Sequence, residues 1–592
     1  MFFIDKFIAD TKDKIKKALF LKKAGSFIVS KNRLIGNKIF YPFFNSLNRN
    51  KKHIATAIIM LFCATILALG LRGIPGNPNG QTINNKEWVE EGPLENSNER
   101  GRFALLYSFI ENKSLFFSLP LARFSTPDLA INNEGRYVSL FAPGVSFLII
   151  PGYVIGKYFG FSQVGAYAII SLFALFNFFL LRAIALRIGA HSLAANIGSM
   201  VFIFASPAFA YAVTLSQHHV STFFILLSMY AIIRWNNYWS LAFVWFLSAL
   251  AISIDYPNFF MMFPIGVFAL GRIIFLNKDN NNFKIGFKYL RLLTFSAMLL
   301  PIIFFAWYNT NANGSLLRLT GTLTRVVAID EAGKPTNSGI GSDIKPLDNN
   351  DLEDKNRKKT AVGTFRTRNL LNGFYIHFIS PDRGIINFAP VMLLGILGFF
   401  YFPIKYANIR NMILAIIGAN ILIYSMFGDP WGGWSFGSRY LIPAYAMLSL
   451  GVVIVIQRWK RNIIFLVVFV WLLINSVNLG VLGALTSNLN PPQVEILELE
   501  QRTGVAQKYS YDRNMDFLRD RGSKSLIFQT VGKNYMTAIT YHKVISYLID
   551  AVLIIMLIAL VIISKGIHFP KILTQKIKTA SAPIISFINK KV

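Results

Sequence analysis

Cysteine and charged side chains are both scarce in this chain. Its 592 residues include one cysteine, Cys63, so a disulfide within the chain and a cysteine-rich metal site are both excluded. Charged residues make up 15% of the chain and hydrophobic residues 54%. Soluble globular proteins carry about 25% charged residues, so this composition argues against a soluble protein.

Apolar stretches of membrane-spanning length recur along the chain. A helix of about 20 apolar residues crosses the roughly 30 Å hydrocarbon core of a bilayer, and lipid offers no partner to the backbone of an irregular segment. The sequence therefore predicts an all-α integral membrane protein with about 12 transmembrane helices. They are expected near residues 53–72, 164–187, 191–213, 217–234, 238–254, 257–276, 291–308, 386–403, 409–427, 436–457, 461–485 and 545–564.

The net charge of +31 is concentrated on one side of this topology. With the N terminus inside, nearly all of the excess lysine and arginine falls in inner segments, as the positive-inside rule requires. The basic residues 1–52 are expected to lie on an anionic inner leaflet, with no nucleic acid as a partner and no cleaved signal peptide. We therefore predict a multi-pass protein of the cytoplasmic (inner) membrane, with both termini cytoplasmic.

Four regions follow from this topology. They are a basic cytoplasmic arm (1–52), a transmembrane core (53–485) with outer loops 73–163 and 309–385, an outer-face loop or small cap (486–544), and a last transmembrane helix with a basic tail (545–592). Residues 142–161 are apolar but interrupted by prolines, which predicts a pair of interfacial helices. The polar residues 329–360 predict a mobile loop. No inverted repeat is visible, which counts against a transporter.

Two carboxylates stand out on the outer side. Glu99 opens a helix in the first outer loop, where the helix dipole alone would favour a negative charge. Asp255 lies between two apolar runs with almost no polar loop around it. Ionisable groups at that depth are usually functional, although Asp255 could instead cap the helix that begins at Pro257.

Histidine and arginine side chains are expected at the same face. His218 and His219 open a span, but adjacent residues point about 100° apart on a helix, so a shared zinc site is not expected. Arg383 and Arg439 lie where outer loops enter spans. A guanidinium binds phosphate oxygens in a bidentate manner, although an arginine there could also be an interfacial anchor.

Several stretches match a known pattern in order. They are "NERGRFAL" with Glu99, "STPDLAINNEGRYVSLFAPGVSFLIIPGYVIGKYFG" with Asp128 and Arg136, "ASPAFAYAVTLSQHHVS" with His218, "DYPNF" with Asp255, "WYNTNANGSLLRL", "FISPDRGIINFAPVMLL" with Arg383, and "WGGWSFGSRYLIPA" with Arg439. Together, residues 95–445 resemble the GT-C superfamily of membrane glycosyltransferases, particularly bacterial relatives of the dolichyl-phosphate-mannose protein mannosyltransferases. Two departures are Glu99, where many relatives have Asp, and "GSR" in place of "GPR". Residues 446–592 match no motif of the family.

The resemblance implies a multispanning GT-C core with a cavity that opens outward. The donor would be a polyprenyl-phosphate sugar, and the enzyme a hexosyl- or pentosyltransferase that inverts the anomeric carbon. Glu99 would be the general base. The substrate-binding residues would be Asp255, His218, Arg383, Arg439, Asp128 and Arg136, with the two arginines Arg383 and Arg439 on the departing phosphate. No metal-binding residues are predicted, and a divalent metal stays open as a cofactor because some GT-C enzymes use one.

Other functions also fit a multispanning protein with outward-facing arginines. A transporter or flippase of lipid-linked sugars would need the phosphate-binding arginines but no base. An oligosaccharide ligase or polymerase would use a pyrophosphate-linked donor, and a membrane scaffold would need neither arginine. The acceptor, whether a glycan, a lipid or a protein, is not indicated by the sequence.

Overall fold

The computed structural model describes residues 55–564, except 86–87, 89–91, 280–281 and 337–361. The predicted basic arm 1–52, the basic tail and most of the predicted loop 329–360 lie outside the described residues. The chain divides into two compact units, residues 1–62 and 63–592, and the site described below belongs to the second.

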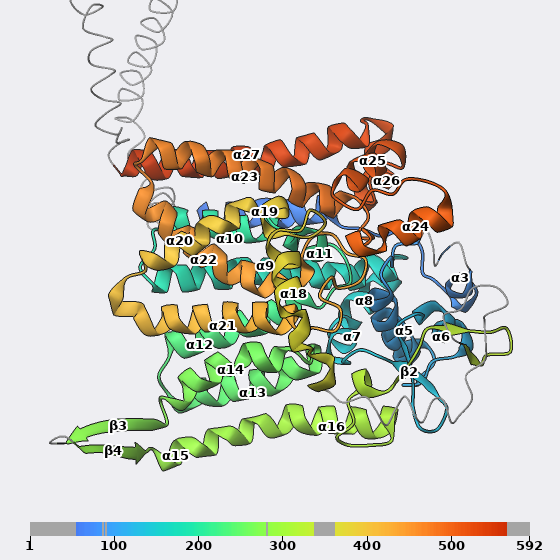
Figure 1. Cartoon of the computed structure of the whole chain (residues 1–592), viewed down its shortest axis with the longest axis horizontal. Coiled ribbons are helices and arrows are strands. Elements are labelled where there is room, and N and C mark those ends of the chain that lie inside the picture. Colours follow the sequence, from blue (N-terminus) through green and yellow to red (C-terminus); the bar gives the residue numbers. More distant parts are fainter. Residues whose placement is uncertain (1–54, 86–87, 89–91, 280–281, 337–361, 565–592) are drawn as a thin grey trace, which may run out of the picture. The chain divides into compact units, whose positions relative to one another are not determined.

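Helices dominate the second unit, and many of them lie side by side in Figure 1. Among the described residues, six are long and apolar enough to cross a membrane: α9 (Ser162–Arg187), α15 to α16 (Tyr289–Asn313), η7 with α21 (Ile404–Ser425), η8 with α22 (Arg439–Trp459), α23 (Ile463–Leu485) and α27 (Ala538–Ile563). Shorter apolar helices are Ala55–Gly70, α10 (Ser192–Phe204), α13 (Tyr238–Ile254), α14 (Asn258–Leu270) and Pro390–Phe400, which comprises η6 and α20. The prediction of an all-α integral membrane protein is confirmed.

Every predicted span coincides with a helix, including α12 (His218–Arg234) for residues 217–234. The exact number that cross the bilayer stays a prediction. Two predicted spans are interrupted. Residues 386–403 form α19 (Ile385–Phe388) and then η6 and α20, and residues 191–213 form α10 and then α11 (Ala208–Ala212). Pro207 follows the break, and a proline cannot donate the backbone hydrogen bond that a continuous helix needs at that position.

Three small antiparallel sheets accompany the helices. In the first, β1 (Leu129–Ile131) pairs with both β2 (Tyr137–Ser139) and β5 (Thr324–Val326). This sheet joins the two outer loops, which are almost 200 residues apart in the sequence. The others pair β3 (Ile274–Asp279) with β4 (Asn282–Phe287), and β6 (Ala328–Ile329) with β7 (Pro335–Thr336). These strands were not expected from the sequence, because they are short and carry no long alternating pattern.

The outer segments also contain short helices. In the first are α3 (Gly80–Asn84), α5 (Ser97–Glu111), α6 (Leu119–Ser125), α7 (Gly144–Leu148) and α8 (Ile150–Tyr158). The last two are the predicted helix pair, although their position at the membrane interface stays a prediction. Other short elements are η1 (Leu293–Met298), η2 (Thr320–Thr322), η4 (Val362–Thr364), η5 (Thr367–Asn369), α18 (Leu370–Phe378) and α19 (Ile385–Phe388).

Residues 486–544 form short helices followed by the start of α27. The short elements are η9 (Gln493–Glu495), α24 (Ile496–Thr503), α25 (Asp512–Asp520), α26 (Leu526–Thr530) and η10 (Gly532–Asn534). Helix α27 begins at Ala538, seven residues before the predicted span, because the Thr537 side chain accepts a hydrogen bond from the Thr540 N–H and caps the helix there.

Close contact between α20 and α22 depends on glycine. A Cβ atom added at Gly398 would lie 1.9 Å from the carbonyl oxygen of Gly451. Small residues let helix backbones approach in this way inside membranes. By contrast, a Cβ atom added at Gly418 in α21 would have nothing within 4 Å.

We expect Gly398→Val to lower the apparent melting temperature in detergent, because the added side chain forces the two backbones apart. Overpacking of this kind costs roughly 1–3 kcal/mol or more. Gly418→Val is the matched control and should melt near the wild type. Equal melting temperatures for the two variants would contradict the close packing of α20 and α22.

Candidate functional site

Glu99 lies in the first turn of α5 and is 1% exposed. Its Oε1 atom accepts only a long hydrogen bond, 3.5 Å from Asn96 Nδ2, and Oε2 has no partner among the described residues. Burial, together with repulsion by Glu95, raises the pKa of Glu99 to about 7 despite the opposing charge of Arg72. A carboxyl with this pKa and a free oxygen has the properties of a general base near neutral pH.

Two arginines accompany this carboxylate: Arg102, which is buried, and Arg439, which is partly buried. Arg102 lies three residues after Glu99, which places it on the same side of α5, and its Nε atom has no partner within the described part of the chain. Arg439 begins η8 (Arg439–Leu441); its Nη2 donates to the Gly432 carbonyl at 2.6 Å, and its Nε is likewise unpaired. The charges of Arg439 and Arg102 both interact with Glu99. The cluster therefore keeps guanidinium N–H groups available to an anion.

Asp255 belongs to the same cluster. It lies at the C-terminal end of α13, and its Oδ2 atom is 3.5 Å from both Gln217 Nε2 and the Tyr424 hydroxyl. The charges of Arg102 and Arg439 act on it. The alternative role in capping α14 is not observed, because Pro257 occupies the N-cap and no side chain caps the helix.

His218 lies at the start of α12 and is 2% exposed. Its ring centre is 5.7 Å from that of Tyr211 and 6.2 Å from that of Tyr440, and its Nε2 atom is unpaired among the residues that the structure describes. His219 points elsewhere, with Nε2 2.7 Å from the Ala208 carbonyl. The two histidines therefore face different partners. Within the described ranges, no group of three His, Cys, Asp or Glu residues could hold a metal.

Arg383 is also buried, but most of its N–H groups are already used. It forms an ion pair with Asp382 at 2.7 Å, and it donates to the carbonyls of Trp431 at 2.7 Å, Gly433 at 2.6 Å and Asn490 at 3.2 Å. These bonds hold the 431–433 turn, whose middle residue accepts from Arg439. Arg383 thus holds the turn that contacts Arg439. Its contact with a phosphate stays a prediction.

The last two predicted residues differ in position. Asp128 accepts from Ser97 Oγ at 2.5 Å and pairs with Arg325 at 2.7 Å, and its charge acts on Arg102, so it lies beside the cluster. Arg136 pairs with Glu134 at 3.3 Å, and both side chains are 56% exposed. The structure does not bring Arg136 together with the buried residues.

A second buried carboxylate was missed by the sequence analysis. Glu95 Oε2 accepts from Arg72 Nη1 at 3.1 Å and from the Asn488 backbone N–H at 2.8 Å, and Lys524 Nζ pairs with Oε1. Desolvation alone would raise the pKa of Glu95, but the charges of Lys524 and Arg72 outweigh it and hold that pKa below its usual value. Glu95 therefore stays ionised near Glu99.

Sequence spacing could have revealed only one of the missed residues. Arg102 follows Glu99 at helical spacing within the "NERGRFAL" motif. No local signal connects Glu95 with Lys524, because these residues are more than 400 positions apart and meet only in the folded chain.

Comparisons with known proteins give distant structural likenesses. No protein-family model and no curated protein matches the chain. It is similar to ArnT from Cupriavidus metallidurans in the apo state, with a TM-score of 0.43 and 10% identity over 85% of this chain and 75% of that chain. It is also similar to the same protein bound to undecaprenyl phosphate, with a TM-score of 0.41 and 10% identity over 84% of this chain and 76% of that chain. A third similar structure is the archaeal oligosaccharyltransferase AglB from Archaeoglobus fulgidus in complex with an inhibitory peptide and a dolichol-phosphate. Its TM-score is 0.39, with 12% identity over 84% of this chain and 56% of that chain. With TM-scores below 0.5, these likenesses assign neither a reaction nor a substrate to this chain.

We expect Glu95→Gln and Lys524→Met each to lower the apparent melting temperature, because breaking a buried ion pair leaves a charge without its partner. Such losses are typically about 3–5 kcal/mol. The double variant should lose less than the sum of the two single losses. Lys508→Met is the control, because Lys508 pairs with Asp516 at the surface and such pairs contribute little. Strictly additive losses would contradict the pairing.

Proposed function

We propose that this chain is a glycosyltransferase that moves a sugar from a polyprenyl-phosphate donor to an acceptor hydroxyl on the outer face of the membrane. The observation that carries the proposal is a buried Glu99 carboxylate oxygen that lies beside two arginines. Neither that oxygen nor the two Nε atoms have a hydrogen-bond partner among the described residues. A buried polar atom without a hydrogen-bond partner lowers the stability of the fold. Several such atoms at one place therefore indicate a site where a bound substrate supplies the missing partners. The donor class comes from the resemblance of the sequence motifs.

Glu99 acts as the general base in this proposal. Its free oxygen accepts the proton of the acceptor hydroxyl as that oxygen attacks the anomeric carbon. The bond between the anomeric carbon and the phosphate oxygen breaks, and its electron pair leaves with the polyprenyl phosphate. A single displacement of this kind inverts the anomeric configuration.

Arg439 and Arg102 stabilise the departing phosphate. The negative charge on the leaving oxygen grows as the bond breaks, and fixed guanidinium donors in a water-poor site stabilise such charge strongly. Arg383 contributes mainly by holding the turn that contacts Arg439.

Asp255 and His218 orient hydroxyl groups of the sugar or the acceptor. Both carry polar atoms close to the arginines, and His218 Nε2 lacks a partner in the described part of the chain. Asp128 lies beside the cluster, where it can contact the substrate, while Arg136 would require a substrate that extends to the surface.

The decisive variant is Glu99→Gln. Purified wild type and variant in nanodiscs are each given a panel of radiolabelled polyprenyl-phosphate sugars as donors. Membrane extract supplies the acceptor. We expect transfer to fall by about 10²-fold or more, since general base catalysis typically contributes 10²–10⁴-fold, while donor binding is kept. Glu111→Gln, on the same helix but paired with Lys157 at its far end, is the control and should transfer normally.

The other functions predict different results in this assay. A transporter or flippase would move the donor without consuming it, and Glu99→Gln would keep that movement. A ligase or polymerase would consume only pyrophosphate-linked donors. A scaffold would bind no donor at all.

The pH dependence of transfer gives an independent check. Glu99 must be ionised to accept a proton, so kcat/KM should rise with pH through about 7 and be lost below it. Glu95→Gln removes the repulsion that raises the pKa of Glu99, so the inflection should move to lower pH. Glu111→Gln should leave the profile unchanged, and an inflection that stays fixed in Glu95→Gln would contradict the assignment of the base.

A further inference from the structure

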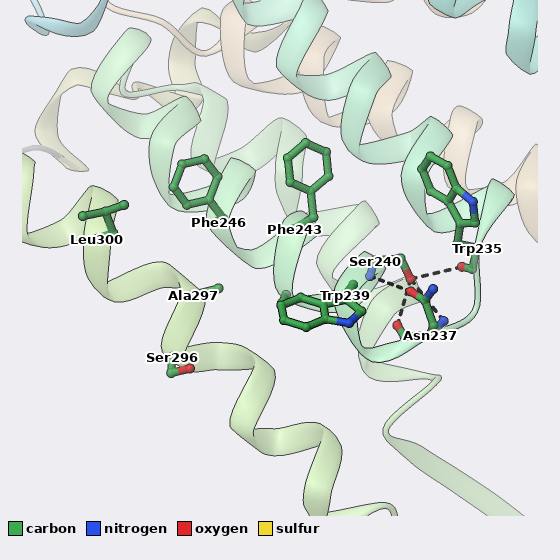
Figure 2. Close-up of a pocket in the computed structure, with 10 residues that line it drawn as sticks. Trp235, Asn237, Trp239, Ser240, Phe243, Phe246, Ser296, Ala297 and Leu300 are labelled. Atoms are coloured by element: carbon green, nitrogen blue, oxygen red, sulfur yellow. Dashed lines mark hydrogen bonds between the residues drawn. The ribbon is translucent and has the colours of Figure 1, made fainter.

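A cavity of about 670 Å³ lies between α13 and the segment formed by η1 and α16. Figure 2 shows its lining, in which aromatic and aliphatic side chains predominate: Trp235, Trp239, Phe243, Phe246, Ala297 and Leu300. Several of these side chains are exposed, including Trp239 at 83% and Leu300 at 67%. An apolar hollow on an apolar helix surface suits a hydrocarbon chain.

Three arginines lie near the turn formed by residues 235–237, of which Trp235 and Asn237 line the cavity. Arg234 is exposed, with its guanidinium carbon 6.0 Å from the centre of the Trp235 ring. Arg272 donates to the Trp235 carbonyl at 2.5 Å, and Arg291 donates to the Arg272 carbonyl at 2.9 Å. These bonds go to carbonyl oxygens rather than to carboxylates.

Negative charge is sparse around this turn. Between residues 231 and 300, Asp255 and Asp279 are the acidic residues, and Asp255 lies at the other end of α13. The arginines repel one another, since the charge of Arg291 acts against that of Arg272. An anion at this position would therefore be attracted by several cations at once.

The cavity is separate from the candidate glycosyltransferase site. Its lining runs along α13 (Tyr238–Ile254) as far as Phe246. Asp255 follows nine residues later, so about 14 Å of helix separates it from the cavity. In Figure 1 the neighbouring hairpin β3–β4 lies at the opposite end of the helices from α5. The positive-inside rule predicts that this basic end faces the cytoplasm.

We propose that this cavity binds an anionic phospholipid, with the phosphate at Arg234, Arg272 and Arg291 and an acyl chain along Trp239, Phe243 and Leu300. Basic pockets between transmembrane helices on the cytoplasmic side bind anionic lipid head groups in this way. The two tryptophans fit the boundary between the head groups and the acyl chains. This lipid site does not depend on the proposed transferase activity.

Quenching of tryptophan fluorescence by dibrominated lipids tests the site directly. The wild type in nanodiscs should be quenched at lower fractions of dibrominated phosphatidylglycerol than of dibrominated phosphatidylcholine. The protein has nine tryptophans, so a Trp235→Phe/Trp239→Phe variant is measured as well. The quenching that this variant loses is the quenching of the two tryptophans in the cavity. Arg234→Gln should weaken the phosphatidylglycerol preference by roughly fivefold, and Arg234→Gln/Arg291→Gln by roughly tenfold or more.

Arg234→Gln is the safer variant, because the Arg234 side chain contacts the Trp235 ring and makes no hydrogen bond to another described residue. Arg410→Gln is the matched control, since Arg410 lies outside this cavity in an inner segment of the predicted topology and should leave the preference unchanged. Equal quenching by the two lipids, or an equal loss in Arg410→Gln, would overturn the proposal. Displacement of the brominated lipid by a polyprenyl phosphate at a lower concentration than by phosphatidylglycerol would also overturn it and assign the cavity to that lipid.

Discussion

The arrangement of the candidate site depends on one buried carboxylate, Glu95. It joins Arg72, which follows the helix Ala55–Gly70, with Asn488 and Lys524 from the segment 486–544. An ion pair this deep is stable only when its members satisfy one another closely. The segment that contains Glu95 also begins α5, so the same interaction fixes the start of the helix that carries Glu99 and Arg102. Residues 486–544 are therefore part of the support of the site.

Three arginines of the candidate site, Arg383, Arg439 and Arg102, differ in how many of their N–H groups already have hydrogen-bond partners. Arg383 is fully buried and gives its N–H groups to a neighbouring carboxylate and three carbonyls. Arg439 and Arg102 each keep an Nε atom that has no partner in the part of the chain that the structure describes. Both kinds of arginine look the same in a sequence motif, but a group that is already satisfied holds the fold, while an unsatisfied one is available to a ligand.

The two ends of α13 have different chemistry. Asp255 at its C-terminal end lies among buried polar groups, whereas its N-terminal half borders an apolar cavity. Three arginines lie near Trp235, which lines that cavity. The two environments share one helix but have no lining residue in common, since the cavity lining on α13 ends at Phe246. The proposed lipid site and the proposed transferase site are therefore distinct.

The sequence by itself determined the membrane class and the helices. Long apolar runs with few charged residues are local properties, and they alone decide whether a segment is stable as a helix in a bilayer. It also pointed to Glu99, Asp255, His218 and Arg439, whose motifs lie at the ends of helices. Only the tertiary structure decided that Arg136 stays at the surface, that Arg383 is already paired, and that Glu95 and Lys524 meet. Glu95 and Lys524 are more than 400 positions apart, and Arg383 donates to carbonyls 48 to 107 positions away. A hydrogen-bond partner supplied from such a distance leaves no pattern near either residue.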